Sequence, residues 1–573
     1  MNVLGISHLF SSNQGAALIK DGKLVAFAEE ERFNRVKSSP NVYPSLSINF
    51  CLREGGLSAG EIDYVAIGSS KMSDILNGHC LYSENINTSD YSPFTTYVSS
   101  YTKHGSPIVN SNFLERYTNF LSLQIANDHC IYKALADHLK VYPNQIDWFP
   151  HHHCHALSGI IPSEFKDCNF MSFDGEGGEN SGIMGVSRSG NYEILDFLPW
   201  HYSLGSFYSS ITSVLGFHTG GGEGKTMGLA SYGNVDRNSL PLFTSRDNKY
   251  SLDRLHAGMY GNWANEIGVL PFGNDILTQK YVNLAATAQH YFENQIISHA
   301  KKLYEITGVK NFALAGGSFL NCTSNGRLLK EDFVDNIFIQ PASHDSGSAL
   351  GAAILSYLDK TNTYPEIDFS TAYWGSSFSN LQITESLSKN NIKFKKLDSV
   401  PETLAKLIND NLAVAYVAGK AEVGPRALCH RSILANPAIR NNLNKINKIK
   451  NREPWRPLAP AMTEESFHDI VDNKNLSPFM LLACQVKENW KNKIPAVVHV
   501  DGSCRPQSIN KNQNPTIHKA LMIFEKMSGV PVFLNTSFNV QGEPLVDSPN
   551  DAILSFLNSD LDALIIEDFL ILK

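Results

Sequence analysis

The sequence has few of the features that mark whole classes of protein. Only 9 of its 573 residues are cysteine, and none of them forms a CxxC pair. An odd and sparse set of this kind argues against a disulfide framework or a cysteine-rich zinc site, so we expect reduced thiols. No apolar run approaches the ~18 residues of a membrane-spanning helix, and the first residues lack the basic and apolar blocks of a secretion signal. We therefore expect a cytoplasmic protein with no membrane partner.

An excess of positive charge is also missing. The chain has 48 Lys+Arg against 56 Asp+Glu, which gives a formal net charge of −8. No global basic field is available to hold a polyanion, so we expect no nucleic-acid partner. The hydrophobic fraction of 42%, with 40 Gly and 25 Pro, falls within the globular range. A folded chain of this length should contain more than one hydrophobic core.

Two similar successions of elements predict a duplicated α/β fold. The first has apolar strands on both sides of Asp21-Gly22, a helix within 43–58 and a buried strand within 62–70. The second begins near residue 165 with three strands, continues with a long helix within 278–308 and ends with the strand in "NFALAGGSFLNC". Two such copies indicate two halves with a cleft between them, into which the glycine loops point.

Two further regions bear on domain organisation. Residues 71–120 lack clear periodicity and are rich in Ser, Thr, Asn and Tyr. They form a predicted insertion, for which a lid, an acceptor-recognition element and a surface loop without a role are all open. After short segments over 365–400, "LAKLINDNLAVAYVAGK" starts a new helix and strand. We therefore predict a division of the chain into residues 1–370 and 371–573.

A histidine cluster indicates a metal site. His151 and His155 lie four residues apart in "HHHCHA", and on a helix this spacing places both imidazoles on one face. Asp345, in a predicted strand-to-helix loop of the second half, is the candidate third ligand, and spacing cannot exclude His344 instead. Two histidines and one carboxylate with open positions suit a catalytic Fe(II) or a similar divalent ion. The alternative for the histidines alone is a structural or solvent-facing pair.

Three glycine-rich segments follow predicted strands or precede predicted helices. Glycine lets backbone N–H groups approach phosphate oxygens, and a helix N-terminus adds a favourable dipole. None of the segments is a GxxxxGKS/T loop, and each alone is explained by a tight turn, but three together favour a nucleotide cleft. The candidate nucleotide-binding residues are Asp174, Gly175, Gly177, Gly178, Gly221, Gly222, Lys225, Gly228, Gly316, Gly317 and Asn321.

The C-terminal region carries cationic residues beside Pro or Gly in otherwise apolar stretches. Guanidinium groups bind phosphate bidentately, so a convergent group of them predicts an anion pocket for a small phosphorylated substrate. The polar tract "NTSFNVQGEP" could hold a carbonyl or a ribose, with an Asn-rich turn as its alternative. The candidate residues of this pocket are Arg426, Arg431, Ser432, Lys450, Arg452, Arg456, Arg505, Asn535, Ser537 and Asn539.

These motifs, with "AFAEEERFNRVK", "EGKTMGLASYG", "GPRAL", "REPWRPLAP" and "HVDGSCRPQ", resemble the O-carbamoyltransferases of the nodulation-factor, cephalosporin and nebramycin type, in the same order along nearly the whole chain. The resemblance implies a duplicated ASKHA domain (actin/hexokinase-like, Kae-like) followed by a smaller YrdC-like α/β domain. It implies that the C-terminal domain makes carbamoyl adenylate from carbamoyl phosphate and ATP with Mg²⁺. The carbamoyl group would then pass, at the N-terminal metal site, to a hydroxyl of a small-molecule acceptor such as a secondary metabolite or sugar.

The resemblance also assigns roles to residues. It implies that His151, His155 and Asp345 are metal ligands and catalytic residues. It implies that the three glycine loops hold the adenylate. The C-terminal cations, with Ser537 and Asn539, would hold carbamoyl phosphate and ATP. His8 and His344 are candidates for the general base, and a phosphate oxygen is the alternative.

The chain departs from the family pattern at a few positions. Asn13 and Gly15 replace the usual Asp and Ser of the first loop, Cys429 and His430 stand in the "GPRAL" segment, and Trp455 replaces Phe. Two other functions compete with O-carbamoyl transfer. One is threonylcarbamoyl transfer to tRNA, against which the acidic balance argues, and the other is a catalytically idle nucleotide-binding relative.

Overall fold

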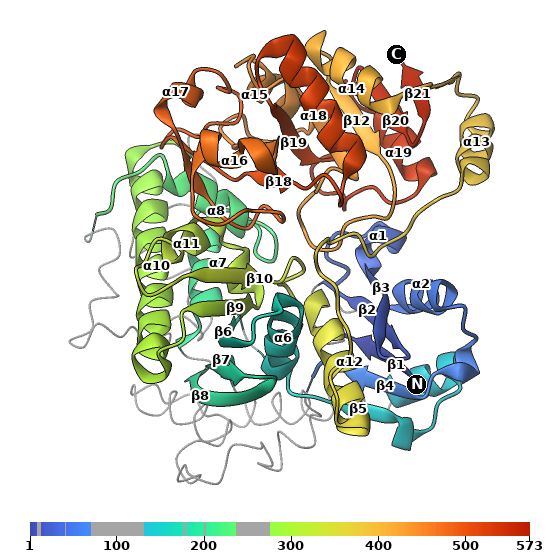
Figure 1. Ribbon diagram of the computed structural model, residues 1–573, viewed down its shortest axis with the longest axis vertical. Coiled ribbons are helices and arrows are strands. Elements are labelled where there is room, and N and C mark those ends of the chain that lie inside the picture. The colour runs from blue at the N-terminus through green and yellow to red at the C-terminus, as the bar shows by residue number, and fades with distance from the viewer. Residues whose placement is uncertain are drawn as a thin grey trace, which may run out of the picture.

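The computed structural model describes residues 1–7, 13–40, 42–69, 131–175, 177, 180–199, 202–236 and 276–573 (Figure 1). The predicted insertion over 71–120, His8 and Gly178 lie outside the described residues. Among the helices of these ranges, none combines the length and the apolar character needed to cross a membrane.

The N-terminal sheet contains the hairpin predicted from Asp21-Gly22. Both residues have positive φ, 50° and 79°, as a two-residue turn between β2 and β3 requires. The strand order is β3-β2-β1-β4-β5. The elements are β1 (Asn2–Ile6), β2 (Gly15–Lys20), β3 (Lys23–Glu29), α1 (Glu30–Asn34), α2 (Ser45–Gly55), η1 (Ala59–Glu61), β4 (Tyr64–Ile67), η3 (Pro143–Gln145), β5 (Ile146–Trp148), α6 (His151–Ile160) and η4 (Ile161–Ser163).

The second sheet repeats the topology of the first. Its order is β10-β9-β6-β7-β8. In each sheet the first three strands pair antiparallel, the fourth pairs parallel with the first, and the fifth pairs parallel with the fourth. This duplication is the ASKHA architecture that was predicted. The elements are β6 (Asp167–Phe173), β7 (Asn180–Arg188), β8 (Asn191–Pro199), α7 (Leu204–Val214), α8 (Glu223–Ala230), α10 (Gln279–Thr307), β9 (Asn311–Ala315), η9 (Gly317–Leu320), α11 (Cys322–Leu328), β10 (Asn336–Ile339) and α12 (Ser346–Thr361).

The last helices of the two halves are exchanged. Helix α6 follows the first sheet but packs on β6, β7 and β9, whereas α12 follows the second sheet but packs on β1, β2 and β4. The two helices lie side by side between the sheets (Figure 1). Their backbones approach closely, because a Cβ at Gly351 would lie 1.7 Å from the carbonyl oxygen of Cys154. This exchange brings the N-terminal ends of α6 and α12 to the same place in the cleft.

The C-terminal region forms the smaller α/β domain that was predicted. Its eight-stranded sheet has the order β11-β21-β20-β12-β13-β19-β14-β18, and β15, β16 and β17 form a small second sheet. The elements are α13 (Asn380–Lys389), β11 (Lys395–Lys396), α14 (Val400–Asn409), β12 (Val414–Val417), β13 (Arg431–Ala435), α15 (Asn442–Ile449), β14 (Ala459–Thr463), α16 (Glu464–Ile470), β15 (Val471–Asp472), β16 (Cys484–Val486), α17 (Glu488–Lys491), β17 (Ser503–Cys504), β18 (Gln507–Ile509), α18 (Pro515–Ser528), β19 (Val532–Ser537), α19 (Pro549–Leu557), β20 (Ala563–Ile566) and β21 (Phe569–Leu572).

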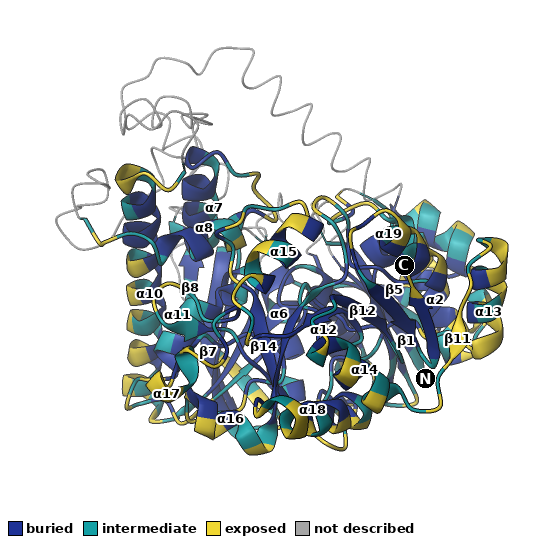
Figure 2. Ribbon diagram, turned by 90° about the horizontal axis from the view of Figure 1, so that it is seen from above, coloured by how far each residue is buried: buried dark blue, intermediate teal, exposed yellow. Residues whose placement is uncertain are grey.

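Buried apolar residues form a large core and a smaller one. The large core runs from the second sheet through α6 and α12 into the C-terminal sheet, and the smaller core lies between the first sheet and α2. Figure 2 shows the central strands buried and the exposed residues on outer helices such as α13 and α18. Because the large core continues into the C-terminal sheet, the N-terminal body packs directly against the C-terminal region.

Candidate functional site

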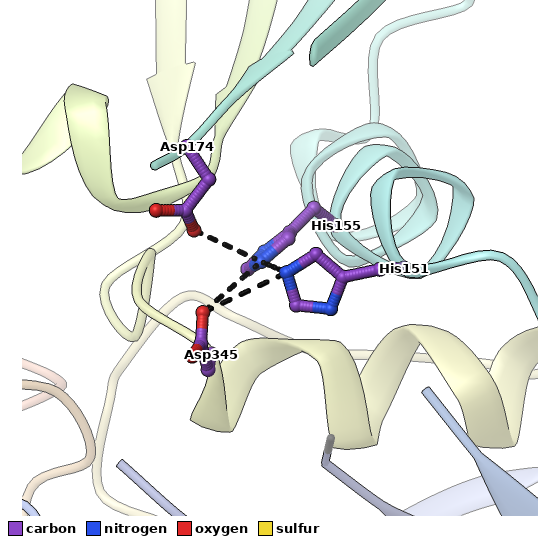
Figure 3. Close-up of side chains that lie close together, drawn as sticks. All are labelled: His151, His155, Asp174 and Asp345. Atoms are coloured by element: carbon purple, nitrogen blue, oxygen red, sulfur yellow. Dashed lines mark hydrogen bonds and ion pairs between the residues drawn. The ribbon is translucent and has the colours of Figure 1, made fainter. Parts of the chain in front are cut away.

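The histidine pair lies on one face of α6, as its spacing predicts. The Nε2 atoms of His151 and His155 are 3.1 Å apart, and both side chains are buried (Figure 3). The Nδ1 atom of His151 lies 3.2 Å from the carbonyl oxygen of Gly68. A proton on Nδ1 would be donated to that carbonyl, and Nε2 would then present its lone pair as a metal ligand.

Two carboxylates face the imidazoles. Asp345 stands at the N-terminal end of α12, and its Oδ1 lies 3.6 Å from His151 Nε2 and 3.8 Å from His155 Nε2. Asp174 follows β6, and its Oδ2 lies 3.4 Å from His155 Nε2. One donor atom from each of the four residues falls within 4.8 Å of the others. Sequence reasoning placed Asp174 among the nucleotide contacts and missed this position, although a carboxylate directly after a strand that ends at the cleft was an available signal.

The electrostatic field of this cluster favours positive charge. Burial lowers the pKa of His151, and the neighbouring His155 adds to this effect. Burial also opposes protonation of His155, but hydrogen bonds and charge from Asp174 and Asp345 raise its pKa to about 9. Burial alone would raise the pKa of Asp174, but the hydrogen bond and the charge of His155 outweigh it and hold this pKa well below its usual range. Two imidazoles and two carboxylates form a donor set that fits a divalent transition-metal ion, and the Nδ1 atom of His155 is buried without a hydrogen-bond partner among the described residues.

The other nearby histidines have their own partners. His152 lies 2.9 Å from the carbonyl oxygen of Asn180, and His153 lies 3.1 Å from the hydroxyl of Tyr192. His344, the alternative third ligand, has Nε2 at 2.9 Å from Glu29 Oε1 and Nδ1 at 2.9 Å from Ser346 Oγ. Both of its nitrogens are engaged, and it is not one of the four residues whose donors come together.

Two of the predicted glycine loops border the cluster. The N–H groups of Gly175 and Gly317 donate to the two oxygens of Asp174, at 2.7 and 3.1 Å. A Cβ at Gly177 would lie 2.6 Å from the ring of His151, and Gly316 has a φ of 92° that side chains rarely adopt. Glycine is therefore required here because the loops pack directly on the donors.

The remaining predicted nucleotide contacts are engaged by other protein groups. The N–H of Gly221 donates to Glu223, and Gly222 begins α8. Lys225 donates to Glu453 of the C-terminal domain at 2.7 Å, and Gly228 packs against Pro457 and Trp455 of that domain. Asn321 caps α11 and donates to Gln289. Lys225 and Gly228 thus shape the contact between α8 and the C-terminal domain.

The structure brings four of the predicted arginines together, and we call Arg426, Arg452, Arg456 and Arg505 with Lys450 the cation pocket. Burial and the charge of Arg505 lower the pKa of Arg426 to about 9. Burial and the charges of Arg456 and Arg505 hold the pKa of Arg452 well below its usual range. The Nε atoms of Arg426 and Arg505 are buried without a hydrogen-bond partner in the described part of the chain. Repelling cations with unused donors favour an anionic ligand.

Lys450 of the cation pocket contacts the polar tract "NTSFNVQGEP" through Ser537 and Asn539. Its ammonium group donates to the carbonyl oxygen of Asn539 at 2.7 Å, to the side chain of Asn539 at 2.8 Å and to the hydroxyl of Ser537 at 3.2 Å. Burial and the nearby charges of Arg452 and Arg456 lower the pKa of Lys450 well below its usual range. The tract is therefore held beside the arginines.

Three of the predicted pocket residues face protein groups instead. Arg431 is fully buried and donates to the carbonyl oxygens of Ala418 at 2.9 Å and Ser376 at 3.0 Å. Ser432 accepts from the N–H of Cys429, and Asn535 donates to Gln507 at 2.9 Å. These contacts stabilise the sheet, and the place of the three residues on an anion stays a prediction.

One departure from the family pattern has a steric reason. A Cβ at Gly15 would lie 3.0 Å from the carbonyl oxygen of Ala28 and 3.1 Å from the Cβ of Ser346. The first loop therefore passes tightly against the start of α12, and a larger residue at position 15 would displace the backbone next to Asp345.

Fold and sites together define a protein with a duplicated ASKHA-type body, which holds a His/Asp cluster, and a smaller C-terminal α/β region, which holds a cation pocket. Residues 2–354 match the family model for the carbamoyltransferase N-terminus, and residues 405–573 match that for the carbamoyltransferase C-terminus. The chain belongs to the carbamoyltransferase family and is a transferase enzyme, as the resemblance in its sequence predicted.

Curated relatives agree with this membership. Nodulation protein NolNO of Sinorhizobium fredii is 32% identical over 586 residues, which cover 100% of this chain and 80% of the relative. Nodulation protein NolO of Bradyrhizobium diazoefficiens is 35% identical, over 74% of this chain and 78% of the relative. Among solved structures, full-length HypF in its phosphate- and nucleotide-bound form has a TM-score of 0.35 at 12% identity, over 63% of this chain and 56% of HypF, too low to carry an argument.

Proposed function

We propose that this carbamoyltransferase works in two steps on two sites. The cation pocket, in residues 371–573, converts carbamoyl phosphate and ATP into carbamoyl adenylate. The His/Asp cluster, in residues 1–370, then directs transfer of the carbamoyl group to a hydroxyl of a small molecule. The observation that carries the proposal is the presence in one chain of buried, unpaired arginine donors and a separate four-residue donor set.

The atoms balance over the two steps. Carbamoyl phosphate first loses inorganic phosphate to water and leaves carbamate. A carbamate oxygen then attacks the α-phosphate of ATP, and pyrophosphate leaves. In the second step an acceptor oxygen attacks the carbamoyl carbon, the bond to AMP breaks, and the hydroxyl proton passes to a phosphate oxygen of AMP. His344 is not needed as the base, because both of its nitrogens are engaged.

The cation pocket supplies the charge that the first step requires. Phosphate and pyrophosphate leave with additional negative charge, and fixed guanidinium groups stabilise that charge without reorganising. Glu453 is balanced by Lys225 at 2.7 Å and by Arg456 at 3.9 Å. Arg426 and Arg505 therefore remain available for the substrate anion.

The His/Asp cluster supplies the geometry of the second step. The cluster would hold a divalent ion, proposed to be Fe(II), with His151, His155, Asp174 and Asp345 as its ligands. This ion would act as a Lewis acid toward the carbamoyl and phosphate oxygens. The N–H groups of Gly175 and Gly317 fix Asp174, and Gly177 packs against the imidazoles. A buried position excludes water from a hydrolysable intermediate.

The test separates the two steps. Protein incubated with ATP and carbamoyl phosphate, without an acceptor, should form carbamoyl adenylate and pyrophosphate, detected by mass spectrometry and a coupled assay. Arg505→Ala should raise KM for carbamoyl phosphate roughly 10- to 100-fold, the loss expected for a hydrogen bond to a charged group. The exposed Lys448→Ala serves as the matched control. Absence of pyrophosphate release from the wild-type protein would refute the proposal.

A further inference from the structure

One buried carboxylate contacts the loops of both sites. Glu29 is the last residue of β3 and is 2% exposed. Its Oε1 lies 2.9 Å from Nε2 of His344, and its Oε2 accepts the N–H of Gly424 at 3.1 Å. Arg32 pairs with the same Oε2 and donates to the carbonyl oxygen of Gly424 at 2.7 Å. Glu29 and Arg32 lie within "AFAEEERFNRVK", a motif to which neither step assigns a role.

On the metal side, Glu29 fixes the residue next to a proposed ligand. His344 precedes Asp345 and is held from both sides, by Glu29 at Nε2 and by Ser346 at Nδ1. The carbonyl oxygen of Asp345 accepts a hydrogen bond from Ser348 at 2.7 Å. The contact between His344 and Glu29 therefore restrains the chain directly before Asp345.

On the anion side, Glu29 fixes the start of the loop that carries Arg426. Gly424 has a φ of 90°, and a Cβ there would lie 2.3 Å from the carbonyl oxygen of Pro341. Two residues later, Arg426 donates to the carbonyl oxygen of Leu320 at 3.1 Å. The loop before Asp345 and the loop before Arg426 are thus in direct contact at Glu29.

We propose that Glu29 is a positioning residue that couples the two sites, so that an anion on Arg426 changes the affinity of the His/Asp cluster for a divalent ion. The inference rests on the proposed function for the identity of the two ligands. By linkage, metal binding must change the affinity for the anion by the same factor. Such coupling would let the metal centre respond to occupancy of the pocket in which the intermediate forms.

The test measures binding of Co²⁺, followed by its visible absorption, with and without saturating inorganic phosphate. In the wild-type protein phosphate should change the Kd for Co²⁺ about fivefold or more, within the usual range of coupling between sites. Glu29→Gln should abolish this change and leave each separate affinity within about twofold, because an amide has one acceptor oxygen where Glu29 uses two. Calorimetric titration of phosphate into Co²⁺-loaded protein checks the reciprocal factor.

Glu31→Gln is the matched control. Glu31 is also buried and pairs with Arg32, but its other partners are Lys37 and the N–H of Ser38. It should therefore keep the coupling. Should Glu29→Gln fail to fold, His344→Gln breaks only the metal side and must also lose the coupling.

Two outcomes overturn the inference: wild-type protein without coupling, or Glu29→Gln with wild-type coupling. Pyrophosphate release is measured separately on the same preparations. Coupling without pyrophosphate release refutes the proposed function alone, and release without coupling refutes the role of Glu29 alone.

Discussion

At the scale of single residues, both sites contain buried polar atoms that no group in the described part of the protein satisfies. The Nδ1 atom of His155 and the Nε atoms of Arg426 and Arg505 have no hydrogen-bond partner in the ranges that the structure describes. Such an atom costs about 1–3 kcal/mol when it stays unsatisfied. These atoms therefore lower the stability of the folded protein, as is common where a ligand supplies the missing hydrogen bonds.

The histidine pair gives a direct prediction. His155→Ala removes a nitrogen that lies within 4 Å of both carboxylates. We expect it to weaken Co²⁺ binding by more than the roughly 10- to 100-fold that loss of an outer partner causes. His153→Ala, on the same helix but directed at Tyr192, should bind Co²⁺ like the wild-type protein. Equal losses in both variants, measured by Co²⁺ titration, would contradict the ligand assignment.

Arg431 gives a prediction about stability. Its fully buried guanidinium group donates to several backbone carbonyl oxygens, and alanine would remove all of these hydrogen bonds. We expect Arg431→Ala to lower the free energy of unfolding in urea by roughly 3–5 kcal/mol. The exposed Arg440→Ala should stay within about 0.5 kcal/mol of the wild-type protein. A small effect at position 431 would leave the residue free for the ligand role that the sequence suggested.

Residue type and spacing predicted most residues of the two proposed sites, but they did not show which groups each side chain contacts. The interval between His151 and His155 was enough to predict a shared face, since a helix fixes that geometry. No local pattern shows that Arg431 lies inside the sheet while Arg426 lies in the pocket, because both stand in the same "GPRALCHRS" segment. Only the contacts made by segments far away in the sequence distinguish them.

At the scale of elements, the close approach of α6 and α12 positions the metal donors. Helix α6 contributes His151 and His155, and α12 contributes its N-cap residue Asp345, so a change in the separation of the helices would move the histidines relative to the carboxylate. The close contact at Gly351 sets that separation.

Substitution of Gly351 tests this packing. A Cβ at position 351 would collide with the backbone of Cys154, so Gly351→Ala should destabilise the protein by roughly 1–3 kcal/mol and weaken Co²⁺ binding. Gly224 is also helical but has open space around it, so Gly224→Ala should stabilise the protein by about 0.5 kcal/mol and leave Co²⁺ binding unchanged. Thermal unfolding and Co²⁺ titration of both variants check the pair, and wild-type Co²⁺ affinity in Gly351→Ala would show that the packing is not critical.

Local signals predicted individual elements well. The turn at Asp21-Gly22, the end of α2 before Gly56 and the long helix α10 all lie where the sequence placed them. The exchange of α6 and α12 could not be predicted in this way. Periodicity shows which face of a helix is buried, but not which sheet covers it.

At the scale of the whole molecule, one short motif joins the two domains. Arg32 donates to Gly424, and Arg35 donates to the carbonyl oxygens of Pro544 and Leu545. Glu30 instead caps α2 within the first half, through the N–H groups of Leu46 and Ser47. The consecutive acidic residues of this motif therefore serve different contacts.

The pH dependence of the free energy of unfolding should depend on the contacts that Glu29 makes with Arg32 and His344. Burial opposes its ionisation, but Arg32 and His344 lower its pKa to about 2 from the usual 4.5. A folded-state pKa below the unfolded value means that the carboxylate stabilises the protein above about pH 4.5 and loses this effect as the pH falls toward 2. We expect Glu29→Gln to have a lower free energy of unfolding than the wild-type protein at pH 7, and the difference to shrink in acid. Urea unfolding at stepwise pH tests this, and a difference independent of pH would contradict it.

The exchange of α6 and α12 has a consequence for any attempt to split the protein. A cut in the segment between η4 and β6 would leave the first fragment with a helix that fits the second sheet, and the second fragment with a helix that fits the first. Each fragment alone would expose the sheet face that the missing helix covers, and would carry only part of the metal donor set. The fragments should therefore be insoluble when produced separately and recover both shape and metal binding only when they are expressed together.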